Sequence, residues 1–300
     1  ALMALEIGTG DEVIVSDWTF YATGSSVISI GAVPIFCDID PKSFLMDPNL
    51  LEDLITERTK AIIPVHLGGM PCKMEEIMEI AQAHNLSVIE DCAHAHGSKY
   101  KGKTVGTWGD CGTFSFQASK VLTAGEGGMI ICQDDELSQK IYQVLDSGRL
   151  PGKWFYNHYA YGSDFRLGEL NAALLRTQLE KYPDQLKKRN ENALYMNEKL
   201  TEIPGILPQE RTADVDCCAQ YVYPVYFDAA KFGNINYETM YQELRQAGIP
   251  VDDTYPPLHI LDCFREINLM QNVDYDNANW GGEKSNPENF PVVTDVHQHS

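Results

Sequence analysis

The chain has 300 residues, of which 44% are hydrophobic, and a formal net charge of −20. A chain of this length and composition can bury a sizeable core, so it is predicted to be globular, with a large domain and a smaller one. The acidic balance argues against nucleic acid and anionic membrane surfaces as partners, because like charges repel at long range.

The first half of the chain alternates between strand-like and helix-like segments. Helix-like patterns occupy residues 23–31, 49–55 and 74–85. Near-continuous apolar strands that alternate with helices predict an α/β fold with a mostly parallel sheet covered on both faces. Ligands of such sheets bind at the carboxyl ends of the strands. The strand-like segments are EVIVSD (12–17), VPIFCDI (33–39), KAIIPVHL (60–67), LSVIED (86–91), CGTFSF (111–116) and GMIICQ (128–133).

The second half begins with a long helical pattern from Arg166 to about Leu200, in which Pro183 is expected to kink or break the helix. Beyond it, YVYPVYFD (221–228), a helix near 237–248 and the loop IPVDDTYPPLHI suit a small α/β domain. We therefore expect a large domain over residues 1–180 and a smaller C-terminal domain over residues 181–300.

Cysteine usage and hydropathy bear on the location of the protein. The eight cysteines show no C-x-x-C spacing and most lie in apolar runs, which favours buried free thiols over disulfides or a metal site. No apolar run reaches the ~18 residues of a membrane-spanning candidate, and the N-terminus lacks the basic region of a signal peptide. We expect a cytoplasmic protein. Both ends look cut, so we expect a fragment of a longer protein that lacks the N-terminal part of the large domain.

Lys120 is the first candidate for chemistry. It lies in TFSFQASKVLTAGEGGMI, among apolar and small neighbours. Desolvation disfavours the ammonium form, lowers the pKa and frees the amine to attack a carbonyl, which is the requirement for a Schiff base. The alternative is a solvated surface lysine. The AGEGG turn that follows allows the backbone to approach a ligand closely.

Asp91 is the second candidate, at the end of the buried strand in VIEDCAHAHGS. An unpaired buried charge is costly, so Asp91 requires a cationic partner. A protonated pyridine nitrogen is one such partner, and pyridoxal phosphate enzymes use an acid in this way. A helix N-cap or a metal ligand are the alternatives. His94 and His96 lie on opposite faces of a strand and no third ligand cluster is visible, so we expect no metal.

A third candidate is Phe20 in DWTFYAT, which could stack on a cofactor ring or simply pack in the core. In the order TFYAT, FCDIDP, IIPVHLGG, VIEDCAHAHGS, GTFSFQASKVLTAGEGG, DFRLGELNAALLRTQLE and YPPLH, the chain resembles the DegT/DnrJ/EryC1/StrS family of sugar aminotransferases. The resemblance implies fold type I, a pyridoxal phosphate cofactor, a homodimer, and amino transfer from glutamate or glutamine to a keto sugar or cyclitol ketone. The lysine and acid segments look most like the scyllo-inosose aminotransferases and the aminohydroxybenzoate synthases.

The resemblance also implies roles for single residues. Lys120 would be the Schiff-base lysine and proton shuttle, Asp91 the partner of the pyridine nitrogen, and Phe20 the side chain stacked on the ring. Ser115 would contact the phosphate. His94 stands where the family usually has a glutamine near the phenolic oxygen, and an imidazole can also donate a hydrogen bond there.

Two departures from the family pattern concern the phosphate. Asp164 stands where the family usually has an asparagine that reaches the neighbouring subunit's cofactor phosphate, and a carboxylate there would repel it. The family's Ser-Gly-Thr phosphate loop belongs upstream of Ala1. Candidates for contacts with substrate hydroxyls are His66, His96, Tyr255 and His259.

Two other functions stay open at this point. A pyridoxal phosphate sugar dehydratase has the same fold, but the sugar 3-dehydratases replace the lysine by histidine, so Lys120 counts against it. A non-catalytic regulatory member of the same fold is the other alternative.

Overall fold

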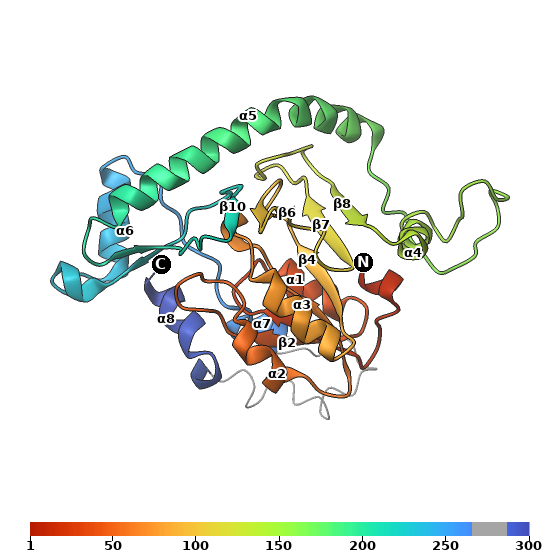
Figure 1. Ribbon diagram of the computed structural model, residues 1–300, viewed down its shortest axis with the longest axis horizontal. Helices are drawn as coiled ribbons and strands as arrows, with labels where there is room; N and C mark the ends of the chain where they lie inside the picture. Colours follow the sequence, from red (N-terminus) through yellow and green to blue (C-terminus); the bar gives the residue numbers. More distant parts are fainter. Residues whose placement is uncertain (266–286, 300) are drawn as a thin grey trace.

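The computed structural model describes residues 1–265 and 287–299 (Figure 1). Its centre is a six-stranded sheet in the order β2-β1-β3-β4-β7-β8. The first five of these run parallel, and β8 is antiparallel to β7. This confirms the predicted α/β fold with a mostly parallel sheet. The strands are β1 (Glu12–Ser16), β2 (Val33–Cys37), β3 (Thr59–Ile63), β4 (Ser87–Asp91), β7 (Cys111–Ser115) and β8 (Gly128–Cys132).

The helices predicted over residues 23–31, 49–55 and 74–85 are present at close to those positions, whereas the helix Asp135–Leu145 was not predicted. Side-chain caps explain where two helices begin. The Asp134 side chain accepts a hydrogen bond from the Leu137 N–H at the start of α4, and the Asn236 side chain accepts one from the Thr239 N–H at the start of α6. The α-helices are α1 (Ala22–Ile28), α2 (Leu51–Leu54), α3 (Met74–Ala83), α4 (Asp135–Leu145), α5 (Glu169–Leu200), α6 (Tyr237–Gln246), α7 (Asp262–Arg265) and α8 (Pro291–His299).

Shorter elements complete the described part of the chain. β10 pairs with β5, which pairs with β6, and β11 pairs with β9, all antiparallel. These strands are β5 (Lys99–Tyr100), β6 (Lys103–Thr104), β9 (Ile206–Pro208), β10 (Val215–Cys217) and β11 (Val225–Phe227). The 3-10 helices are η1 (Leu2–Leu5), η2 (Pro48–Leu50), η3 (Leu67–Gly69), η4 (Ala229–Phe232), η5 (Leu258–Ile260) and η8 (Pro287–Asn289).

The sheet is covered on both faces, as β1 illustrates. All five of its residues are buried, and because strand side chains alternate, Ile14 enters one core while Val13 and Val15 enter the other. Burial of each such side chain contributes roughly 1.5–3 kcal/mol. On the Ile14 side, α3 presents Met74 and Ile77 to the same core.

The C-terminal third of the chain contributes to both cores. Val293 and Val296 of α8 enter the core that contains Ile14, while Leu258 and Phe264 enter the one that contains Val13. Segments far apart in sequence therefore close around one sheet. The division into domains at residue 180 stays a prediction.

Helix α5 runs without interruption through Pro183 over 32 residues. The break considered at this residue does not occur, although proline lacks the N–H that the helix would use there. Its neighbour Tyr182 is buried and donates its hydroxyl to the His96 carbonyl oxygen at 2.6 Å, which holds this turn against the large sheet. Figure 1 shows α5 as one curved helix along the edge of the molecule.

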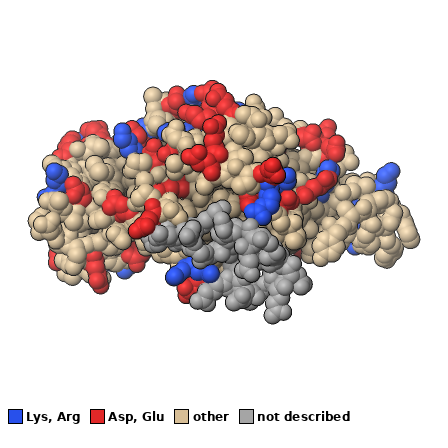
Figure 2. All heavy atoms as spheres, turned by 90° about the horizontal axis from the view of Figure 1, so that it is seen from below, with Lys and Arg blue, Asp and Glu red and all other residues tan. Residues whose placement is uncertain are grey.

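The cysteines and the surface agree with the composition. All eight cysteines are free thiols and five are buried, as predicted. None of the helices in the described part of the chain combines the length and apolarity that crossing a membrane requires. On the face seen in Figure 2, Asp and Glu cover more of the surface than Lys and Arg, as the net charge of −20 implies.

Candidate active site

Lys120 lies in the connection between β7 and β8, just beyond the carboxyl end of β7. The Lys120 N–H donates to the Gln117 carbonyl at 2.9 Å and the Ala124 N–H to the Phe116 carbonyl at 2.9 Å, so this connection is an ordered turn. Gly125 and Gly127 adopt φ of 82° and 142°, a region that glycine enters without a Cβ penalty. The sequence therefore folds back to place the lysine at the edge predicted for ligands.

The amine of Lys120 is partly withdrawn from water. Burial lowers its pKa, and the Asp91 carboxylate opposes this by raising it. Its Nζ lies 4.5 Å from the ring centroid of Tyr221, within cation–π range. The desolvated environment predicted from the apolar neighbours is thus present, and an acid and an aromatic ring surround the amine.

Asp91 is the last residue of β4, which pairs with β7 through Asp91 and Thr113. Its Oδ2 accepts from the Thr23 hydroxyl at 2.9 Å, and its Oδ1 from the Ala93 N–H at 3.1 Å. Both donors are neutral, so within the described residues the carboxylate keeps its charge available to Lys120. Thr23, at the start of α1, was not singled out from the sequence.

Aromatic rings lie around Lys120 and Asp91, and two of them, Tyr221 and Tyr255, come from the C-terminal part of the chain. His94 lies against Tyr221 with ring centroids 4.2 Å apart and stacks on Tyr255 at 6.0 Å. Phe20 lies 5.8 Å from Tyr255 and is 47% exposed, so its ring stays accessible to a ligand. The structure brings the predicted Phe20, His94 and Tyr255 together beside Lys120, whose charge acts on His94.

His94 is a neutral hydrogen-bond donor in this setting. Burial and the nearby Lys120 charge lower its pKa to about 3. Its Nδ1 accepts from the Gly68 N–H at 3.3 Å, which leaves the proton of the neutral ring on Nε2. The Nε2 lies 3.5 Å from the Tyr255 hydroxyl. An imidazole here supplies one N–H, the same kind of donor as the glutamine usual in the family.

Tyr221 was missed in the sequence, although it lies in the aromatic-rich run YVYPVYFD. Its hydroxyl lies 2.8 Å from the Ser119 hydroxyl, which donates to Gln117 Oε1 at 2.6 Å. Ser115, the predicted phosphate contact, accepts from the Gln117 N–H at 3.4 Å and is half-buried. These hydroxyl groups form a polar rim around the lysine.

The three other predicted substrate contacts are buried and hold protein groups. His66 donates from Nε2 to Glu90 at 3.1 Å, and His96 donates from Nε2 to the Ser115 carbonyl at 2.9 Å. His259 pairs with Asp17 at 2.6 Å. Contacts of these rings with substrate hydroxyls stay predictions.

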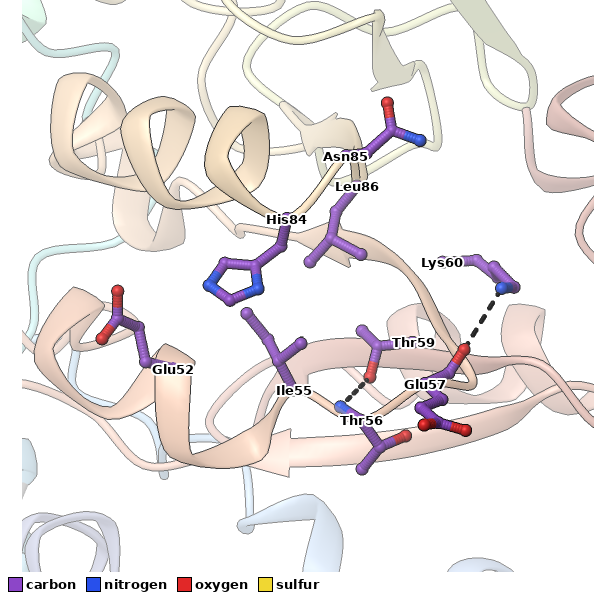
Figure 3. A pocket seen from close by; sticks show the side chains of 9 residues that line it. All are labelled: Glu52, Ile55, Thr56, Glu57, Thr59, Lys60, His84, Asn85 and Leu86. Carbon is purple, nitrogen blue, oxygen red and sulfur yellow. Dashed lines mark hydrogen bonds between the residues drawn. The ribbon is translucent and has the colours of Figure 1, made fainter.

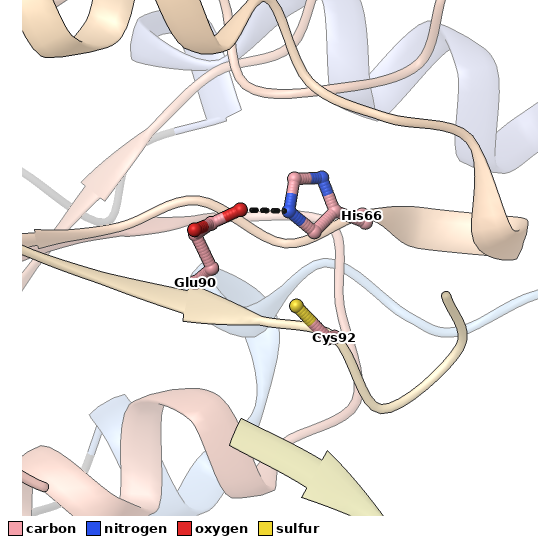
Figure 4. A group of neighbouring side chains, drawn as sticks. All are labelled: His66, Glu90 and Cys92. Atoms are coloured by element: carbon pink, nitrogen blue, oxygen red, sulfur yellow. Dashed lines mark hydrogen bonds and ion pairs between the residues drawn. The ribbon is translucent and has the colours of Figure 1, made fainter. Parts of the chain in front are cut away.

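His66, Glu90 and Cys92 form one group whose ligand-type atoms lie within 4.8 Å of one another (Figure 4). Glu90 is already saturated by donors, because it accepts from His66 and from the N–H groups of Gly106, Trp108 and Gly109. Burial raises the pKa of the Cys92 thiol well above its ordinary value, whereas a metal binds the thiolate. We interpret the group as a hydrogen-bonded core element.

A hollow of about 560 Å³ lies near the amino ends of the strands, where α3 ends and β3 and β4 begin (Figure 3). The chemistry described above lies at the carboxyl ends, so this hollow is not part of it. Its lining residues are Glu52, Ile55, Thr56, Glu57, Thr59, Lys60, His84, Asn85 and Leu86.

Asp164 lies apart from the other predicted residues, in the connection between α4 and α5. Arg166 donates to its two carboxylate oxygens, both at 2.7 Å, and lowers the pKa of Asp164 to about 2. Figure 1 shows this connection extending away from the sheet. Asp164 is therefore an exposed, ionised and internally paired carboxylate.

Comparison with known proteins gives consistent matches over most of the chain. The model of the DegT/DnrJ/EryC1/StrS aminotransferase family matches residues 1–285. GDP-perosamine synthase of Caulobacter vibrioides is 38% identical over 269 residues, which cover 89% of this chain and 71% of that protein. L-glutamine:2-deoxy-scyllo-inosose aminotransferase of Streptomyces lividus is 37% identical over 268 residues, 86% of this chain and 63% of that protein. The chain thus spans less than two thirds of the latter's length.

Solved structures agree with these matches. A 3-amino-5-hydroxybenzoic acid synthase superposes with a TM-score of 0.87 at 28% identity, covering 99% of this chain and 75% of its own. A PLP-form structure from Streptococcus pneumoniae has a TM-score of 0.81 at 28% identity and covers 99% of this chain and 76% of its own. The resemblance stated from the sequence motifs and the fold type I architecture are confirmed.

Proposed function

Since the chain belongs to the DegT/DnrJ/EryC1/StrS aminotransferase family, we propose that it is a pyridoxal phosphate-dependent aminotransferase. Its amino donor would be glutamate or glutamine, and its acceptor a keto sugar or cyclitol ketone. The observation that carries this proposal is the position of the desolvated Lys120 amine beside the Asp91 carboxylate, at the carboxyl ends of adjacent strands.

The residues present fit the cofactor on four counts. Lys120 supplies an amine with a lowered pKa, and Asp91 an acid whose described partners are neutral. Phe20 offers an exposed ring, and His94 a neutral N–H. For the phosphate, Ser115 offers a hydroxyl, whereas the ionised Asp164 does not fit an anion. We expect the phosphate contact to be the weakest part of the site in this chain.

When bound, pyridoxal phosphate supplies an electron sink through its protonated ring nitrogen. The Asp91 carboxylate would keep that nitrogen protonated, because an opposite charge nearby favours the cationic form. The Lys120 amine would hold the cofactor covalently and, once released, carry a proton at Nζ, for which a lowered pKa is favourable. Thr23 fixes the carboxylate in place through its 2.9 Å hydrogen bond.

The acceptor class rests on the relatives and on the polar rim. Relatives named for a nucleotide-linked amino sugar and for an aminocyclitol match with nearly equal identity, 38% and 37%. Ser119, Tyr221 and Tyr255 present hydroxyls beside Lys120, which suits a polyhydroxylated ring. The lysine counts against a dehydratase, and its desolvation counts against a merely non-catalytic member.

The proposal is tested with Lys120→Ala and the matched variant Lys181→Ala, which changes an exposed lysine of α5. With glutamine or glutamate and a panel of keto sugars and cyclitol ketones, Lys120→Ala should lose activity by about 1,000-fold or more, because the nucleophile is gone. Absorbance near 410 to 430 nm, recorded after adding the cofactor, should bleach with the donor in the wild type and in Lys181→Ala, but not in Lys120→Ala. A Lys120→Ala protein of normal rate would overturn the proposal.

We also propose that the protein is a homodimer. The connection between α4 and α5 exposes several large aromatic side chains, including Trp154 at 71%, Tyr156 at 72% and Tyr161 at 86%. Exposed apolar surface of this kind marks a protein interface. Sedimentation should give a dimer for the wild type and a shift toward monomer for Trp154→Ser with Tyr161→Ser. A wild type that sediments as a monomer at micromolar concentration would contradict this.

A further inference from the structure

Asp17 is an acid that the proposed chemistry does not use. It follows β1 directly and is fully buried, with 0% of its surface exposed. Its partner is His259 in η5, 242 residues further along the chain. His259 is equally buried and contacts Asp17 twice: its N–H donates to Oδ1 at 2.9 Å, and its Nδ1–H to Oδ2 at 2.6 Å.

Two more hydrogen bonds join the same two segments. The Leu258 N–H donates to the Asp17 carbonyl at 2.8 Å, and the Trp18 indole N–H to the Tyr255 carbonyl at 2.7 Å. Residues 255–259 are therefore attached to the end of β1 by four hydrogen bonds. One of them binds the main chain of Tyr255, whose side chain contacts Phe20 and His94.

We propose that Asp17 and His259 are positioning residues that hold Tyr255 in place as a wall of the acceptor site. This deepens the proposed function and rests on it, because Tyr255 is assigned there to the acceptor hydroxyls. In this role the pair acts through the main chain of residues 255–259 and needs no contact with substrate or cofactor.

Burying the Asp17 carboxylate costs free energy. A buried Asp–His pair is seldom more stable than apolar residues of the same volume, so stability alone explains it poorly. The Asp17–His259 pair instead fixes the position and orientation of the segment that it binds. Residues 250–257 form no regular helix or strand, so no ladder of backbone bonds fixes Tyr255. A displacement of about 1 Å can cost roughly 100-fold in rate where it misaligns reacting groups, and for a residue that only binds the acceptor the loss should be smaller and fall on KM.

The geometry identifies a matched pair of variants. Only Nδ1 of the His259 ring contacts Asp17, and its Nε2 has no hydrogen-bond partner among the described residues. In His259→Asn the amide nitrogen takes the place of Nδ1 and keeps the donor. His259→Leu fills similar space without a donor. The two variants differ chiefly in the bond to the Asp17 carboxylate.

The first measurement needs no turnover. Hydrogen exchange of the full-length protein should show the amides of Leu258 and His259 protected in the wild type and in His259→Asn. In His259→Leu they should exchange about 100-fold faster, while the amides of β1 and β3 stay unchanged. Equal protection in the Asn and Leu variants would overturn the attachment. If His259→Leu does not fold, Asp17→Val replaces it, because valine has a similar volume and offers no acceptor to the Nδ1–H.

The second measurement is a double-mutant cycle with Tyr255→Phe, using a keto acceptor that the wild type aminates. His259→Leu should raise the KM for the acceptor about tenfold relative to His259→Asn, with kcat changed less than about threefold. In the Tyr255→Phe background, His259→Leu should raise the KM for the acceptor by less than about twofold relative to His259→Asn, because the positioned hydroxyl is already absent. A full tenfold effect in that background would overturn the role. Absence of turnover in the wild type would refute the proposed function instead, and with it the role assigned to Tyr255, while exchange still decides the attachment.

Discussion

Two acids at the carboxyl ends of β1 and β4, two parallel strands of one sheet that are separated by β3, have opposite surroundings. Asp17, after β1, is fully buried and bound to His259, and burial raises its pKa while His259 opposes the rise. Asp91, at the end of β4, is half-buried and bound by Thr23 and Ala93. Across from Asp91 lies the Lys120 amine, whose pKa it raises. One acid thus anchors a distant segment, and the other faces a reactive group.

The difference lies in the partner and not in the strand. Both strands are rich in apolar residues, and each has an Asp at its carboxyl end, Asp17 directly after β1 and Asp91 as the last residue of β4, so the local pattern is similar. A buried His that satisfies the carboxylate from the C-terminal part closes the first site to solvent. A lysine on the adjacent connection, with an open side toward Phe20, leaves the second accessible to a ligand.

Changing each acid to Asn should have the largest effect and should separate the two roles. Asp91→Asn should lower kcat/KM by at least about 100-fold, because it removes the charge that would keep the ring nitrogen protonated. Its free energy of unfolding should change by less than about 1 kcal/mol, as expected for a group outside the core. Asp17→Asn should instead lower the free energy of unfolding by about 3 kcal/mol, because one partner of a buried pair is lost. Kinetics and urea denaturation measure the two quantities.

Asp38 provides a control for these two substitutions. It also follows a strand, β2, and accepts from the N–H groups of Val292 and Val293 at the start of α8, at 3.0 and 2.8 Å. Asp38→Asn should therefore behave like Asp17→Asn, with a smaller loss of about 1 kcal/mol. If Asp17→Asn and Asp91→Asn changed activity and stability in the same proportion, the comparison would fail.

A smaller effect should appear in the titration of Lys120. Burial lowers its pKa from the ordinary 10.5, and the Asp91 carboxylate raises it because a negative charge stabilises the ammonium. Asp91→Asn should therefore lower the pKa further, whereas Asp17→Asn should leave it unchanged. The pH dependence of acylation of Lys120, followed by mass spectrometry against an exposed lysine such as Lys181, measures this. An upward shift in Asp91→Asn would contradict the assigned proximity.

Features that are determined by residues close together in the sequence could be predicted. The six strands of the large sheet, Lys120 and Asp91 are marked by local apolar runs and by what interrupts them. The direction of β8 was not predicted, because pairing is decided between strands. A contact of His259 with a substrate stays a prediction, but its bond to Asp17 was not predicted, since nothing in the local sequence reveals a partner 242 residues away. Tyr221 and Thr23 escaped notice for the same reason.

That long separation also has a consequence during synthesis of the chain. The β7–β8 turn that carries Lys120 closes between residues a few positions apart, whereas Asp17 and His259 are 242 residues apart. At typical elongation rates, Asp17 leaves the ribosome roughly ten to fifty seconds before His259 is made. Throughout that interval Asp17 lacks its His259 partner, so the Tyr255 wall can attach only after the strands and the turn that carry Asp91 and Lys120 have been made.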